Sequence, residues 1–210
     1  MFGNQKLYWA KGQMSDKSLS QEKINNLILL YKKGLIKEAL VEAEQLIENN
    51  PNSFFLHNIH GMININLKKW NKSIESLSKA IEIKQDYAEA HNNLGVALNN
   101  LAHLEKAIES YLNAIKFKPD YANAHNNLGS VFNDLGRWEE ALESYSKALE
   151  YNPENNEAYE NLIKLLTFYK PKKANSNSIV IANQELQNIK YNYNSNKKIT
   201  DNEISNFFKK

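Results

Sequence analysis

The sequence contains no cysteine, and Arg137 is the only arginine among its 210 residues. The lack of cysteine excludes disulfides, thiolate metal sites and cysteine nucleophiles together. Recognition of phosphate and guanine depends strongly on the bidentate guanidinium group of arginine, so we expect no binding of nucleic acid. The formal net charge of +2 is also too small to attract the whole chain to a polyanion or a membrane.

Long apolar runs are absent as well. The segment from Met1 to Ser18 is polar and mixed, without the apolar run of a signal peptide, and no stretch reaches the length that crosses a bilayer. We therefore expect a cytoplasmic protein without a membrane partner. Asparagine, lysine and isoleucine are abundant, which fits an AT-rich genome and does not by itself indicate a function.

The sequence does contain an internal repeat with a period of 34 residues, since Ala88–Tyr121 aligns with Ala122–Asn155. The recurring pairs are Leu94 and Leu128, Gly95 and Gly129, Ala107 and Ala141, Tyr111 and Tyr145, Ala114 and Ala148, and Pro119 and Pro153. Weaker copies cover Ser20–Ser53 and Phe54–Tyr87, and Asn156–Lys170 supplies a first helix alone. Self-similarity at this period indicates a solenoid rather than a single globular core.

Each copy has the pattern of two amphipathic helices, such as residues 87–101 and 104–117. Gly95 and Gly129 fall inside helices, where glycine costs about 1 kcal/mol, so we expect them at close contacts between helices. Pro119 and Pro153 should end the second helices. One hairpin cannot bury its apolar face alone, so the copies must stack, with about nine helices between Ser20 and Lys170.

This pattern of small and large apolar residues, with a proline two residues before the end of each copy, resembles the tetratricopeptide repeat (TPR) family. The resemblance covers about residues 20–170, and the central copies are most similar to the repeats of protein O-linked N-acetylglucosamine transferases. Similar arrays precede the catalytic domains of bacterial glycosyltransferases and sulfotransferases. The resemblance implies an all-α, right-handed superhelical solenoid of stacked antiparallel helix pairs, whose first helices line a concave groove that binds peptides or proteins.

The expected organisation has four parts. A disordered segment, 1–19, precedes the TPR array, 20–170. The array comprises repeats at about 20–53, 54–87, 88–121 and 122–155 and a closing helix at 156–170. A linker, 171–178, leads to a helical tail, 179–210, which alternatively begins a further domain that this chain lacks.

Asparagines at the sixth position of the repeats are the best candidates for binding. Asn93, Asn127 and Asn161 share this register, and the resemblance to the O-linked N-acetylglucosamine transferases places them along the groove, holding a peptide backbone. A side-chain amide both donates and accepts, so a row of amides can pair with an extended chain. Alternatively, asparagine is simply common at this position in TPRs. With the other concave positions of the family, the predicted groove comprises Asn58, Met62, Asn92, Asn93, Val96, Asn99, Asn100, Asn126, Asn127, Ser130, Asn133, Asp134 and Asn161.

Two other kinds of site are not expected. His57, His91 and His125 also recur every 34 residues, but equivalent residues of stacked helices lie about 10 Å apart, whereas zinc ligands lie about 2 Å from the metal. We therefore expect them to have packing roles. The carboxylate clamp of chaperone-binding TPRs needs lysine and asparagine where the first repeat has Ile24 and Ile28, so a chaperone tail is not the expected ligand.

No nucleophile and base pair, paired acids or phosphate-binding loop stands out, and we expect no catalytic residue, metal or cofactor. The first hypothesis is a free-standing scaffold that binds a protein or an extended peptide. The alternative is the substrate-recruiting part of a glycosyltransferase, sulfotransferase or similar enzyme whose catalytic domain is absent from this chain. The abrupt end at Phe207 to Lys210 slightly favours the alternative.

Overall fold

The computed structural model describes residues 21–168, and this part of the chain folds into nine helices without a strand. They are α1 (Gln21–Lys32), α2 (Ile36–Asn49), α3 (Phe54–Asn66), α4 (Trp70–Ile83), α5 (Ala88–Asn100), α6 (Leu104–Phe117), α7 (Ala122–Asp134), α8 (Trp138–Tyr151) and α9 (Asn156–Phe168). The predicted all-α class and helix number are therefore confirmed within these residues. The predicted disordered segment, linker and tail lie outside the described residues.

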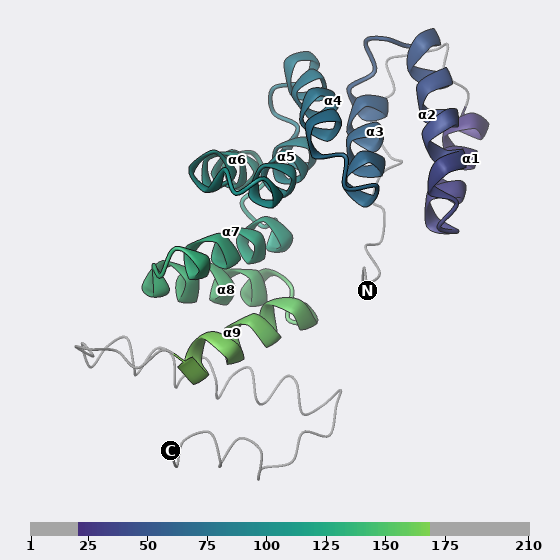
Figure 1. The fold of residues 1–210 in the computed structure, drawn as a ribbon. Helices are drawn as coiled ribbons and strands as arrows, with labels where there is room; N and C mark the ends of the chain where they lie inside the picture. The colour runs from purple at the N-terminus through teal and green to yellow at the C-terminus, as the bar shows by residue number, and fades with distance from the viewer. Residues whose placement is uncertain (1–20, 169–210) are drawn as a thin grey trace.

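The helices stack in chain order along a curved path (Figure 1). Each helix packs against its sequence neighbours, and α3, α5, α7 and α9 also contact one another in succession. The first helices of successive repeats therefore form one continuous layer, as expected for the inner layer of a TPR solenoid. None of the helices in this part of the chain is long and apolar enough to cross a membrane.

Glycine allows the two helices of a repeat to approach closely. A Cβ atom at Gly95 in α5 would lie 2.5 Å from the Tyr111 ring, and one at Gly129 in α7 would lie 2.8 Å from the Tyr145 ring. Real Cβ atoms almost never make contacts this short. The prediction that these glycines mark close helix contacts is confirmed.

In the second repeat, the close contact between α3 and α4 includes a serine in place of alanine. Ser73 stands where the other repeats have alanine; it is fully buried, and its hydroxyl donates to the Gly61 carbonyl at 3.0 Å. A buried hydroxyl without a partner would destabilise the fold. The hydrogen bond therefore explains how serine replaces alanine at this position.

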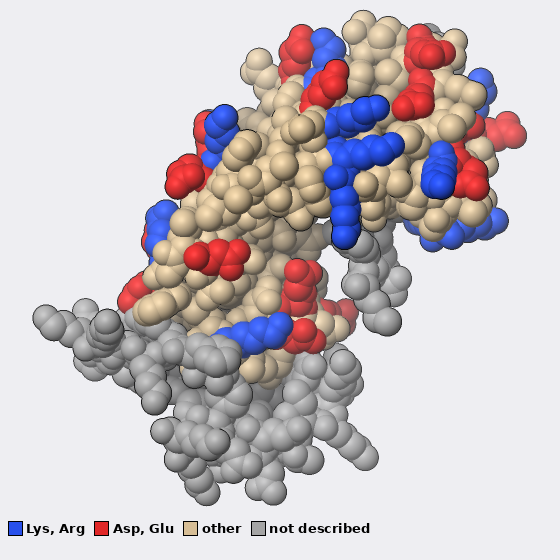
Figure 2. Space-filling model, viewed as in Figure 1, with Lys and Arg blue, Asp and Glu red and all other residues tan. Residues whose placement is uncertain are grey.

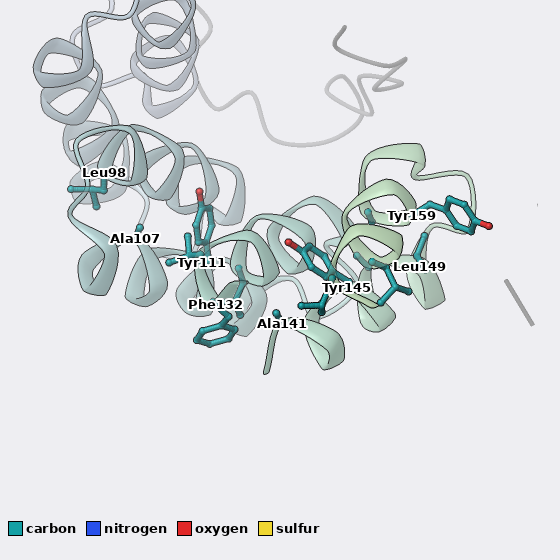
Figure 3. Packing of buried hydrophobic residues seen from close by; sticks show 14 residues of the cluster. Leu98, Ala107, Tyr111, Phe132, Ala141, Tyr145, Leu149 and Tyr159 are labelled. Carbon is teal, nitrogen blue, oxygen red and sulfur yellow. The ribbon is translucent and has the colours of Figure 1, made fainter. Parts of the chain in front are cut away.

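The core runs continuously through the last repeats. One cluster of buried apolar side chains extends from Leu98 through Tyr111 and Tyr145 to Leu162 and joins α5 to α9 (Figure 3). A second cluster, which includes Ile24, Leu46 and other residues of α1, α2 and α3, supports the first repeats. Stacking of neighbours thus buries the apolar faces that single hairpins would expose.

The turn inside each repeat needs a residue in the left-handed region. Gly34 and Gly136 have φ angles of 75° and 69°, whereas Lys68 and Ala102 occupy the equivalent places at 56° and 57°. Residues with a side chain are strained in this region by about 1 kcal/mol. The turns of the second and third repeats are therefore locally less favourable than those of the first and fourth.

A polar cluster interrupts the core between α2, α3 and α4. The Nδ1 atom of His60 lies 2.7 Å from the Ser76 hydroxyl, and its Nε2 atom lies 3.8 Å from the Glu44 carboxylate. Asn64 is fully buried and donates to the His60 carbonyl at 2.9 Å. Burial lowers the pKa of His60, and the opposing attraction of Glu44 is smaller.

This cluster predicts a pH-dependent stability. Because the pKa of His60 is lower in the folded state, the unfolded chain binds the proton more readily, so stability should fall as the pH drops below about 6.5. We expect the thermal midpoint to fall by a few degrees between about pH 7.5 and pH 5.5. In His60→Leu, which introduces the residue found at Leu94 and Leu128, this fall should be smaller. An equal fall in both proteins, measured by circular dichroism, would show that another group causes it.

Candidate peptide-binding groove

The candidate site lies along the layer formed by α3, α5, α7 and α9. The fifth and sixth positions of successive repeats meet on this layer and form a ladder of paired amides. Asn93 Nδ2 donates to Asn58 Oδ1 at 3.0 Å, and Asn127 Nδ2 donates to Asn92 Oδ1 at 3.0 Å. Asn161 repeats the arrangement with Asn126 Oδ1 at 3.2 Å.

The two members of each pair differ in exposure. The acceptors Asn58, Asn92 and Asn126 are only 0%, 5% and 3% exposed, and they lie beneath the donors, which are partly exposed. A buried amide oxygen without a donor would cost about 1–3 kcal/mol. The ladder therefore stabilises the contact between repeats.

The sequence prediction missed this pairing. Asn58, Asn92 and Asn126 were assigned to the groove surface through the family's concave positions, whereas the structure buries them. The signal was available, because Asn92 and Asn126 recur with the same 34-residue period as Asn93 and Asn127 and each directly precedes one of them. Amides at the adjacent fifth and sixth positions of the third and fourth repeats indicate pairing between repeats.

The remaining predicted groove residues are accessible. Partly exposed side chains are Met62, Asn93, Val96, Asn99, Asn127, Ser130 and Asn161, and exposed ones are Asn100, Asn133 and Asp134. Asn100 turns back onto its own helix, where its amide donates to the Val96 carbonyl at 2.9 Å. Within residues 21–168, the side chains of Asn99 and Asn133 make no hydrogen bond. These two amides can therefore meet a ligand without losing an existing hydrogen bond.

The predicted groove changes character along the array. Its first part presents Tyr31, Phe55 and Met62, all partly exposed, whereas the part on α5 and α7 presents mainly amides. Glu89 on α5 is paired with Lys118 at 3.2 Å, which reduces its effect as a free charge. Exposed Asp134 is the remaining charge among the predicted groove residues of α5 and α7. A surface made mainly of amides favours pairing with a backbone over recognition of a charged side chain.

The periodic histidines have a structural role, as predicted. The Nε2 atoms of His57, His91 and His125 lie 2.8–2.9 Å from the backbone carbonyls of residues 51, 85 and 119, each six residues earlier in the chain. Each ring therefore holds the turn that joins two repeats. Among residues 21–168, no group of three histidine or carboxylate side chains could hold a metal ion.

The position of the chaperone clamp is occupied by core residues. Ile24 is 1% exposed and belongs to the apolar cluster of the first repeats, and Ile28 packs against that cluster. Neither side chain can bind a carboxylate. The first repeat therefore lacks the polar surface on which such a clamp depends.

Comparisons with known proteins agree with this geometry. A family model described as tetratricopeptide repeat matches residues 122–155, and one described as TPR repeat matches residues 63–101 and 103–133. No curated protein sequence matches the chain significantly. The matched segments therefore carry tetratricopeptide repeats.

Solved structures resemble the whole array. A crystal structure of MamA is 22% identical, with a TM-score of 0.64, and the match covers 81% of this chain and 95% of MamA. MamA from Desulfovibrio magneticus RS-1 is 16% identical, with a TM-score of 0.65 over 84% of this chain and 96% of that one. The first TPR domain of Spaghetti (RPAP3), bound to the HSP90 peptide SRMEEVD, is 22% identical, with a TM-score of 0.52 over 53% of this chain and 89% of that one. The described residues thus have the all-α TPR solenoid fold.

Proposed function

We propose that this protein is a scaffold that binds an extended peptide, or an extended segment of a protein, along α3, α5, α7 and α9. The observation that carries the proposal is the recurrence of accessible amides, one set per repeat, on the inner layer. Such a row matches a ligand that itself repeats, as a peptide backbone does. The RPAP3 domain, which shares the fold, was solved with a peptide bound.

The ladder can bind a ligand and link repeats at the same time. A side-chain amide has two N–H donors and an oxygen with two lone pairs. In Asn127 and Asn161, the hydrogen bonds between repeats use the amide nitrogen as a donor. Each of these amides therefore retains an oxygen acceptor that can face a backbone N–H.

Three narrower expectations stay predictions. They are the cytoplasmic location, the absence of catalytic activity and the closer similarity of the central repeats to those of O-linked N-acetylglucosamine transferases. The amide chemistry of the predicted groove suits peptide binding both by a free-standing scaffold and by the substrate-recruiting array of an enzyme.

The test separates binding from stability. Peptides selected by display against the wild-type protein should bind about tenfold more weakly to the double variant Asn99→Ala and Asn133→Ala, because each lost hydrogen bond contributes about 0.5–1.5 kcal/mol. The thermal midpoint should change little, since neither side chain bonds to the protein in residues 21–168. Isothermal titration calorimetry and circular dichroism would measure the two quantities.

The matched control changes two asparagines on second helices, Asn71→Ala and Asn113→Ala, and should bind as the wild type does. If the selected peptides bind equally well to the groove variant, the amides of α5 and α7 do not contact the ligand and the proposed site is wrong.

A further inference from the structure

Six lysines gather at two neighbouring turns of the array. The turn between α1 and α2 carries Lys32, Lys33 and Lys37, and the turn between α3 and α4 carries Lys68, Lys69 and Lys72. All six are exposed, and none forms an ion pair with another residue of the range 21–168. Figure 2 shows adjacent lysine side chains over α3 and α4. We name this surface the lysine edge.

The helix pairing brings the two turns together. Both join the first helix of a repeat to its second, and antiparallel packing of α1, α2, α3 and α4 places such turns on one side of the solenoid (Figure 1). Equivalent points of packed helices lie on the order of 10 Å apart. The lysine edge is therefore one positive patch rather than two separate ones.

The patch stops after the second repeat. In the third repeat the first turn of the second helix contains Glu105 beside Lys106, and in the fourth it contains Glu139 and Glu140. Arg137 is also neutralised there, because it pairs with Glu140. The first turn of α2 has one acidic residue, Glu38, beside Lys37, and that of α4 has none. Within residues 21–168 the positive surface therefore spans these two turns.

The lysines of the α3–α4 turn oppose the local stability of that turn. Lys68 has a φ of 56°, where Gly34 and Gly136 stand in other repeats. Lys69 is the N-cap of α4 but makes no side-chain cap bond, and Lys72 lies in a first turn without any acidic residue. Helix N-termini favour negative charge, so a lysine there is unfavourable. Residues that oppose the local preferences for backbone conformation, helix capping and helix-end charge at one place point to a function.

We propose that the lysine edge binds an acidic segment of a partner protein, at a surface distinct from the groove. A patch that spans two turns is about as long as a short run of aspartate and glutamate. The charges of such a run lie a few ångströms apart along an extended chain. A bilayer or a long duplex is larger than the patch and extends toward the acidic turns of the later repeats. Lysine alone also lacks the bidentate geometry that arginine brings to phosphates.

The probe is a fluorescent peptide of eight glutamates, measured by anisotropy at low salt and again at about 0.15 M salt. It should bind the wild-type protein, and more weakly at the higher salt, because screening weakens exposed charges. The triple variant Lys68→Gln, Lys69→Gln and Lys72→Gln should bind about tenfold more weakly, since exposed pairs contribute modestly each. A peptide of eight glutamines should not bind.

A matched control removes the same charge elsewhere. Lys106→Gln, Lys116→Gln and Lys164→Gln change three exposed lysines of α6 and α9 and should keep the wild-type affinity. Equal weakening in both triple variants would overturn the proposal, because binding would then depend on net charge alone. Failure of the glutamate peptide to bind would also overturn it, as would preferential binding, through the same lysines, of phosphatidylserine vesicles or a DNA duplex.

A stability readout distinguishes this role from a structural one. The single variant Lys72→Glu should bind the glutamate peptide more weakly while its thermal midpoint stays the same or rises, because glutamate suits a helix N-terminus. If its midpoint falls together with the affinity, Lys72 supports the fold and its contribution to a binding surface is contradicted.

Discussion

Replacing Gly129 by tryptophan should lower the thermal midpoint of the array by several degrees, up to about 12 °C. A Cβ atom at this position already lies 2.8 Å from Tyr145 and 3.2 Å from the Cβ of Ser144, so a large ring has no space between α7 and α8. Overpacking of a core costs about 1–3 kcal/mol and occasionally more, and each 1 kcal/mol shifts the midpoint of a chain of this size by about 2–4 °C.

The control for this variant is Ser78→Trp, which introduces the same residue at an exposed position of α4 and should leave the midpoint nearly unchanged. Thermal unfolding followed by circular dichroism measures both. A Gly129→Trp protein that melts like the wild type would show that α7 and α8 are not in close contact at this point.

Breaking the amide ladder should have the second large effect. In Asn127→Ala the oxygen of Asn92, which is 5% exposed, loses its donor across the contact between repeats. Leaving a buried acceptor without its partner costs about 1–3 kcal/mol. Changing Asn93, Asn127 and Asn161 together should therefore destabilise the array by several times this amount, so loss of peptide binding by this triple variant would not by itself locate the ligand.

A double-mutant cycle on one pair measures the link directly. Asn92→Ala, Asn127→Ala and the double variant should give a coupling energy within about 0.5–3 kcal/mol, as residues in one hydrogen-bonded network do. Chemical denaturation provides the free energies of unfolding. Additive effects of the two substitutions would contradict the hydrogen bond between repeats.

The sequence predicted the fold well because the 34-residue period reflects the packing contacts directly. Gly95 and Gly129 are tolerated in helices only where another helix lies close, so their positions identified contacts that the structure confirms. The ends of the second helices at residues 117 and 151 also follow from Pro119 and Pro153.

The candidate site was harder to predict because amides serve both packing and binding. Asn58 and Asn99 have the same side chain, yet one is fully buried in a contact between repeats and the other is partly exposed. The spacing within a helix placed both on the concave side but could not show how deep each lies. That depth depends on how far the neighbouring repeat covers the side chain, which is a property of the stacked array.

Polar residues at apolar positions of the repeat pattern marked a further feature whose contacts the sequence could not show. His60 and Asn64 stand where the third repeat has Leu94 and Leu98, and they form a polar cluster with Ser76 that the repeat pattern gave no reason to expect. The sequence shows such a departure clearly, but only the structure shows which neighbours the polar groups contact. Within residues 21–168 the buried side-chain oxygen of Asn64 has no hydrogen-bond partner.

The most direct test of the binding account is site-specific photo-crosslinking of a peptide selected against the wild-type protein. A photoreactive amino acid replaces Asn99 on the inner layer or, as the control, exposed Ser78 on α4. The account predicts a crosslink from position 99 that excess unlabelled peptide abolishes, and none from position 78. A crosslink from position 78 with none from position 99 would contradict the claim that the ligand lies along α3, α5, α7 and α9.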